Sequence, residues 1–178
     1  IGRLVIPLCD AELGDSRCSV RLDPPTWTSS TAYAVRPAAE AGSGAVVKPT
    51  AFNTRHFKCT TSGVSAGSEP AWVTTIGSTT ADGGAVWTAI RALTFTGTLT
   101  GVSSGNKIFA NSAMTDPPSG FFTRGKFTFA SGANSGLARE VKSYVNSTST
   151  LTMQRVFPFT VAVGDAYSVT AGCGKKRI

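Results

Sequence analysis

The sequence is poor in the residues on which most catalytic sites are built. Its 178 residues include a single histidine, and only 15% are charged. A Ser-His-Asp or Cys-His site for hydrolysis would have to use that histidine, His56. No nucleophile-elbow sequence occurs in the chain, and His56 lies in a strand-like run beside Phe57. We therefore expect a surface or edge-strand histidine, and a protein that is not an enzyme.

The sequence also lacks a long hydrophobic run and a dense set of cysteines. No apolar stretch approaches the roughly 18 residues of a membrane-spanning helix, and residues 1–8 read as a short strand rather than a signal peptide. The chain does not begin with methionine, so we expect a processed or excised piece of a longer protein. Four cysteines are too sparse for a disulfide scaffold, which favours an intracellular, metal-binding or buried role.

What the sequence has in abundance indicates β-structure. The chain contains 19 glycines and 9 prolines, and its short apolar runs are separated by Gly, Pro and Ser turns with no long helical period. We predict a mostly-β protein with little helix, in which a barrel-like or sandwich-like domain carries an inserted small β module. The expected boundaries are residues 1–25 plus 92–178 for the discontinuous domain and residues 26–91 for the module.

Alternation of apolar and polar side chains predicts the strands of the discontinuous domain. Phe127 and Phe129 share one parity, which is typical of a half-buried strand. The same reading puts Val141 and Val145 on one face of a later strand and Tyr144 on the other. Leu151 and Met153, and then Tyr167 and Val169, define two further strands. Turns are expected at residues 134–136 and 163–165.

The charge balance is basic but scattered. The formal net charge is +7 and the isoelectric point about 9.6, a balance that permits contact with nucleic acid or an acidic partner. Residues 175–177 form the one basic run, so a solvated surface is the favoured interpretation. Asp10, Glu12 and Asp15 lie close together in a polar turn, where we expect solvated or turn-capping acids rather than a glycosidase or hard-metal site.

The cysteines carry the most specific chemistry. Cys9 and Cys18 lie near one end of the chain and Cys173 near the other. If the fold brings the ends together, their thiolates converge on a site suited to a metal, an iron–sulfur cluster or a disulfide. Eight residues separate Cys9 from Cys18, more than zinc ribbons use, whereas iron–sulfur sites tolerate wider spacing. From these residues alone, ordinary free cysteines are an equally good interpretation.

The segments around these cysteines resemble the signature of a tailed-phage protein family. Residues 13–22 resemble its L-G-D-x-x-C-x-V-x-L motif, and residues 164–165 with 171–173 resemble its closing G-D … G-C-D-K pattern. Members of that family are tail-tip hub proteins of siphophages and gene transfer agents. They are similar to the lambda-type tail-tip L protein, whose C-terminal domain holds a 4Fe-4S cluster on four cysteines. The resemblance covers roughly residues 5–23 and 92–178.

This resemblance implies a structural protein of the virion, located at the tail tip and assembled in the bacterial host cytoplasm. It implies a hub that links the tail tube to a central fibre or spike. The partners would be a distal tail protein and the fibre or spike protein, with a homotrimer around the tail axis. The resemblance implies that a 4Fe-4S cluster, acting as a structural staple, is held by Cys9, Cys18 and Cys173.

Two departures from the family pattern concern the cluster. Gly174 stands where the family has an acidic residue. No cysteine follows Cys173, so the family's fourth ligand would lie beyond Ile178 unless Cys59 substitutes for it. Three alternatives follow: the fourth ligand lies outside these 178 residues, or Cys59 substitutes for it, or the site holds no intact cluster in this chain.

Residues 26–91 resemble a small β module that recurs in phage tail and virion proteins. Its pattern includes F-x-C-T-x-x-G-x-S, E-P-x-W and D-G-x-x-x-W, all of which occur here. Cys59 belongs to this pattern, so the resemblance implies a core cysteine rather than a cluster ligand. The aromatic residues favour core packing of a small domain, and a carbohydrate-binding or host-surface adhesion module is the alternative function. The residues of such a platform would be Trp27, Tyr33, Trp72 and Trp87.

Overall fold

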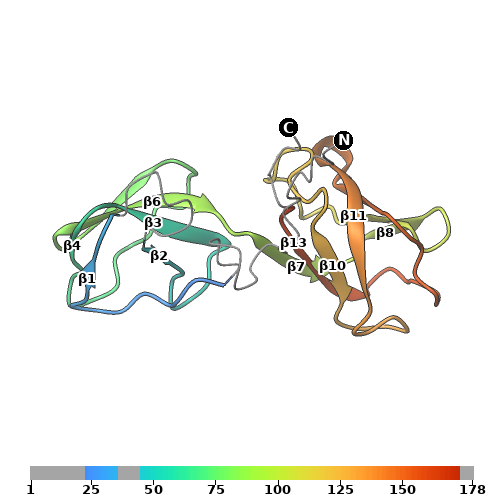
Figure 1. The fold of residues 1–178 in the computed structure, drawn as a ribbon, viewed down its shortest axis with the longest axis horizontal. Helices are drawn as coiled ribbons and strands as arrows, with labels where there is room; N and C mark the ends of the chain where they lie inside the picture. The colour runs from blue at the N-terminus through green and yellow to red at the C-terminus, as the bar shows by residue number, and fades with distance from the viewer. Residues whose placement is uncertain (1–22, 36–44, 173–178) are drawn as a thin grey trace, which may run out of the picture.

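The computed structural model describes residues 23–35 and 45–172, and these form two β-rich lobes that lie side by side (Figure 1). The first lobe comprises the described residues up to Arg91, and the second begins at Thr94. The predicted fold class is confirmed, since the described chain consists of strands, turns and one three-residue 3-10 turn, η1 (Asn146–Thr148). No helix among these residues is long and apolar enough to cross a membrane.

The first lobe contains a four-stranded antiparallel sheet in the order β2-β3-β6-β5 and a two-stranded sheet of β1 and β4. The strands are β1 (Ala32–Tyr33), β2 (Val46–Val47), β3 (Arg55–Thr61), β4 (Gly63–Val64), β5 (Thr79–Asp82) and β6 (Ala85–Arg91). The β5–β6 hairpin turns at Gly83, whose φ of +59° favours glycine. A Cβ on Gly63 would lie 2.2 Å from the backbone of Gly84, so this turn packs on β4 only because Gly63 has no side chain.

The second lobe is a seven-stranded antiparallel sheet in the order β7-β13-β10-β11-β12-β9-β8, curled into a half-barrel (Figure 1). The strands are β7 (Thr94–Thr98), β8 (Gly101–Ser103), β9 (Ile108–Ala110), β10 (Lys126–Phe129), β11 (Ala138–Val145), β12 (Thr150–Met153) and β13 (Ala166–Thr170). The two edge strands, β7 and β8, are separated in sequence only by Leu99 and Thr100. The same run of chain therefore pairs with β13 at one edge of the sheet and with β9 at the other.

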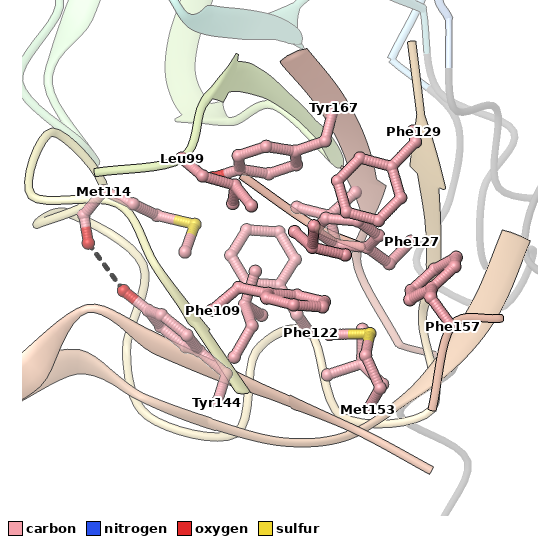
Figure 2. Close-up of a cluster of buried hydrophobic side chains, with 14 residues drawn as sticks. Leu99, Phe109, Met114, Phe122, Phe127, Phe129, Tyr144, Met153, Phe157 and Tyr167 are labelled. Atoms are coloured by element: carbon pink, nitrogen blue, oxygen red, sulfur yellow. Dashed lines mark hydrogen bonds between the residues drawn. The ribbon is translucent and has the colours of Figure 1, made fainter. Parts of the chain in front are cut away.

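Aromatic side chains fill the interior of the second lobe (Figure 2). Phe127 and Tyr167 stack with ring centroids 4.7 Å apart, and Phe129 meets Phe157 edge to face at the same distance. These contacts combine apolar burial with the offset and edge-to-face geometries that aromatic pairs prefer. Two long connections supply the rest of the core, with Met114 and Phe122 from residues 111–125 and Phe157 and Val161 from residues 154–165.

The predicted faces of one strand were wrong. Tyr144 is buried, with its hydroxyl donating to the Met114 carbonyl oxygen at 2.7 Å, whereas Val145 is 43% exposed. The cause is a register shift between Val141 and Ser143 in the pairing of β11 with β12. Such a β-bulge reverses the inward and outward positions of every residue that follows it. The remaining alternations hold, since Leu151, Met153, Tyr167 and Val169 are all buried.

The position predicted for His56 was also wrong. The residue lies in β3, which pairs with β2 on one side and β6 on the other, so it is not on an edge strand. Its side chain is buried, and its ring centroid lies 5.9 Å from that of Phe52. Burial lowers the pKa of His56 below its ordinary value, an effect that Asp23 opposes and Lys48 reinforces. The single histidine of the chain is thus held neutral by the fold.

We predict that the chain becomes less stable as the pH falls through the ordinary pKa of histidine. The unfolded chain takes up a proton near pH ~6.5, whereas folded His56 resists it, so the unfolded state binds more protons below that pH. The free energy of unfolding should fall as the pH drops below about 7, through the ordinary pKa of histidine, and level off once the folded histidine also charges. Urea unfolding followed across this range measures the effect. The His56→Gln variant should lose this pH dependence, and an unchanged slope in that variant would contradict the assignment.

Candidate functional site

Asp82 is the one buried carboxylate among the described residues. Its Oδ2 accepts hydrogen bonds from the indole Nε1 of Trp27 and of Trp87, both at 2.8 Å, and its Oδ1 accepts one from the backbone N–H of Ala66 at 2.8 Å. A buried charge is tolerated only when its hydrogen-bonding capacity is met, and three donors do so here. Asp82 therefore ties the start of the lobe, the Ala66 loop and β6 to the end of β5.

The aromatic residues proposed for a glycan platform pack on one another around this carboxylate. Trp87 is fully buried and Trp27 is 9% exposed, while Tyr33 and Trp72 are partly buried against the same cluster. The rings of Tyr33 and Trp87 meet edge to face with their centroids 4.7 Å apart, and the ring centroids of Trp72 and Phe57 lie 4.1 Å apart. The arrangement is that of a small hydrophobic core, in which Tyr33 and Trp72 alone keep partly accessible rings.

Glu69 holds the partly exposed indole of Trp72 at the outside of this cluster. Its Oε1 accepts hydrogen bonds from Trp72 Nε1 at 2.7 Å and from the backbone N–H of Thr50 at 2.9 Å. Burial acts to raise the pKa of the Glu69 carboxyl, but the bonds from Trp72 and Thr50 outweigh it and hold the pKa below its ordinary value. The ionised carboxylate thus fixes the position of the Trp72 indole.

Cys59 lies in the same core and has the environment of a protonated thiol. It is fully buried, and its Sγ donates to the Thr61 carbonyl oxygen at 3.2 Å. Burial raises the pKa of the thiol, although the Thr61 contact acts in the opposite direction. A metal ligand must be a thiolate, so these surroundings oppose ligation. Within residues 23–35 and 45–172, no three His, Cys, Asp or Glu side chains come together as a metal site would require.

The other predicted metal ligands, Cys9, Cys18 and Cys173, lie outside the described residues, as do the acidic turn at 10–15 and the basic run at 175–177. The structure does describe how the chain approaches Cys173. The Gly172 N–H donates to the Phe121 carbonyl oxygen at 2.9 Å, and a Cβ on Gly172 would lie 1.6 Å from the Thr123 carbonyl oxygen. The backbone immediately before Cys173 is therefore fixed against the Phe121–Thr123 turn.

A second glycine completes this junction. A Cβ on Gly125 would lie 1.9 Å from the carbonyl oxygen of Thr170, so the same turn and the end of β13 touch backbone to backbone at two places. The absence of a side chain at Gly172 therefore permits close approach of the chain to itself at the last described residue.

An open hollow of about 490 Å³ lies next to this junction. Its lining includes Thr123, Arg124, Glu140, Lys142 and Gln154. The charged groups are of both signs, and the lining contains no histidine or cysteine. Such a mixture offers no paired nucleophile and base for covalent catalysis.

Sequence reasoning missed Asp82 as a structural centre. The residue stands in the D-G-x-x-x-W pattern, but an Asp before Gly is also typical of a hairpin turn, and β5 and β6 do turn there. The available signal for its role as a hydrogen-bond acceptor was that tryptophans, which need an acceptor when buried, occur both before and after Asp82 in the sequence. Trp27 lies 55 residues away from Asp82, so nothing local indicates that they meet.

We predict that Asp82→Ala destabilises the first lobe by about 3–5 kcal/mol, because three buried donors lose their acceptor together. Asp82→Asn should cost a large part of this, since its amide NH₂ must face either the two indoles or the Ala66 N–H. All three tryptophans of the chain lie in this lobe, so urea unfolding followed by tryptophan fluorescence reports on it alone. Glu69→Gln, which alters a partly exposed acceptor, is the matched control and should cost about 1 kcal/mol or less. Equal losses in the two variants would refute the central role of Asp82.

Comparison with known proteins gives one family match. Residues 120–177 match the family model described as "Phage conserved hypothetical protein BR0599". The matched segment includes β10 to β13, the glycine junction and the position of Cys173. A comparison of the sequence with curated proteins found no match.

Among solved structures, the chain is similar to one titled "Virion of native gene transfer agent (GTA) particle". The TM-score is 0.44 at 12% sequence identity, and the match covers 68% of this chain and 54% of that chain. This chain therefore spans about half the length of that one, and a score this low does not establish a shared fold. The comparisons thus show that the part of the chain from Gly120 onward is similar to a family of proteins conserved in phages.

Proposed function

We propose that this chain is a structural component of a phage virion, and specifically a tail-tip hub protein that links the tail tube to a central fibre or spike. The observation that carries the proposal is the match of residues 120–177 to a phage-conserved family. The same residues contain the Gly164-Asp165 and Gly172-Cys173 pairs that resemble the closing signature of tail-tip hub proteins. In this role the partners are a distal tail protein and the fibre or spike protein, and the assembly is a homotrimer around the tail axis.

The physical character of the described lobes supports a structural, non-catalytic role. Both are antiparallel sheets with well-packed aromatic cores. The one histidine is buried and kept neutral, and the described cysteine is a buried thiol. His56 and Cys59 thus contribute to packing, which is consistent with a connector between other virion proteins.

We further propose that Cys9, Cys18 and Cys173 hold an iron–sulfur cluster, with a fourth thiolate from sequence beyond Ile178. Three cysteines form a donor set that suits such a cluster. Cys59 does not fit as the fourth ligand, because its thiol is fully buried among aromatic side chains of the first lobe. When bound, the cluster would supply a cross-link between segments distant in sequence. The Gly172 junction supports this role, since it anchors the backbone next to Cys173 on the second lobe.

Anaerobic purification of this chain, and of a longer one extended past Ile178, tests the cluster. The extended chain should absorb broadly near ~400 nm and contain iron and sulfide in stoichiometric amounts. Cys18→Ser should remove the absorption, whereas Cys59→Ala should retain it and serves as the control. Colourless, iron-free protein from both the chain and the extended chain would contradict the cluster proposal. If Cys59→Ala also lost the absorption, Cys59 would be the fourth ligand.

The hub role has a separate test that does not depend on iron. Antibodies raised against the chain should label purified phage particles at the junction of the tail tube and the central fibre in negative-stain electron microscopy. Antibodies against the major tail-tube protein, which should label the length of the tail, are the control. Label confined to the outer ends of the side fibres would favour the host-surface adhesion alternative, and label on the capsid or none at all would contradict a tail-tip position.

A further inference from the structure

The connection between β9 and β10 reaches from the second lobe to the first. Asp116 lies in this connection, and its Oδ2 is 3.1 Å from Arg55 Nη1 and 3.4 Å from Arg91 Nε. Arg55 begins β3 and Arg91 ends β6, so both arginines belong to the first lobe. One carboxylate of the second lobe therefore bridges two cations of the first.

The two arginines need a shared counter-charge. Arg55 and Arg91 are direct partners in the β3–β6 register, and like charges placed opposite each other destabilise a sheet. Arg91 Nε is buried and makes no hydrogen bond within the described part of the chain, while Arg55 Nε donates to the Thr74 carbonyl oxygen at 2.9 Å. The Asp116 carboxylate is thus the acidic group that offsets both charges at this end of the sheet.

Asp116 is also held in place from its own lobe. The Asn146 Nδ2 donates to the carbonyl oxygens of Thr115 and Pro117, at 2.7 and 2.9 Å, on either side of Asp116. The buried Tyr144 hydroxyl donates to the Met114 carbonyl oxygen at 2.7 Å (Figure 2). The backbone around Asp116 is therefore fixed before its side chain meets the arginines, so little conformational entropy opposes the contact.

We propose that Asp116 is a latch that sets the orientation of the two lobes. Ala92 and Leu93 connect β6 to β7. The chain can still rotate about this connection, so the relative orientation of the lobes has to be restrained by side-chain contacts between them. The Asp116 bridge supplies that restraint at the point where the lobes meet. This inference stands on the geometry of the described residues and does not depend on the proposed virion role.

Limited trypsin digestion of Asp116→Asn tests the latch, because trypsin must extract the Arg91 side chain to cut the Arg91–Ala92 bond. In the native chain the bridge withholds that side chain. The variant should be cut there about fivefold faster. An ion pair that contributes about 1 kcal/mol, the upper end of the range for exposed pairs, changes the population of the open, cleavable state by this factor. Cleavage after the exposed Arg155 is the internal reference and should keep its rate. Small-angle X-ray scattering should give a curve for the variant that differs from that of the native chain.

Asp23→Asn is the matched control, since it removes the same charge from an ion pair with Lys48 that lies within the first lobe. That variant should behave as the native chain in both measurements. Salt near ~1 M, where the Debye length is about 3 Å, should move the native chain toward the behaviour of Asp116→Asn. If Asp116→Asn does not fold, as judged by circular dichroism, Arg55→Gln removes the shorter of the two contacts from the first-lobe side and should change the same measurements in the same direction. Cleavage and scattering equal to those of Asp23→Asn would overturn the proposal.

Discussion

The second lobe depends on a single run of chain, residues 94–103, that pairs with both ends of its sheet. Because this run leaves one edge as β7 and reaches the other as β8, the sheet has to curl. Curling encloses the aromatic side chains and leaves two short edge strands, β7 and β8. The aromatic core follows from this curl, because the inward faces of the strands then surround one interior.

The two long connections of the second lobe are part of its core rather than loose loops. Asn134 is fully buried, and its side chain donates to the carbonyl oxygen of Phe159 and accepts from the Phe159 N–H. Asn106 accepts from the Val161 N–H in the same way. These bonds satisfy backbone groups that have no strand partner, which is the requirement for running irregular chain over a packed interior. Phe157 and Val161 can then face inward while Phe159 remains exposed.

The sequence predicts those features that depend on local pattern. Alternation correctly identified the buried faces of β10, β12 and β13, and the turn predicted at residues 163–165 directly precedes β13. It failed for Tyr144 and Val145, because a bulge is fixed by pairing with β12 and leaves no mark in the parity of β11. It failed for His56, because whether β3 is an edge depends on where β2 and β6 are placed. The roles of Asp82 and Asp116 were missed for a related reason, since their partners are distant in sequence and a lone acid in a turn has an ordinary explanation.

The connection between β9 and β10 contacts both the first lobe and the end of the second-lobe sheet. Its first half carries Asp116, which contacts the first lobe, and its second half carries Phe121 and Gly125, which hold the end of β13. Met114 and Phe122 anchor the same connection in the aromatic core. Packed interiors transmit displacement because they have few voids to absorb it. Because this one connection touches both the first lobe and the backbone up to Gly172, the second lobe offers a packed path between these two places.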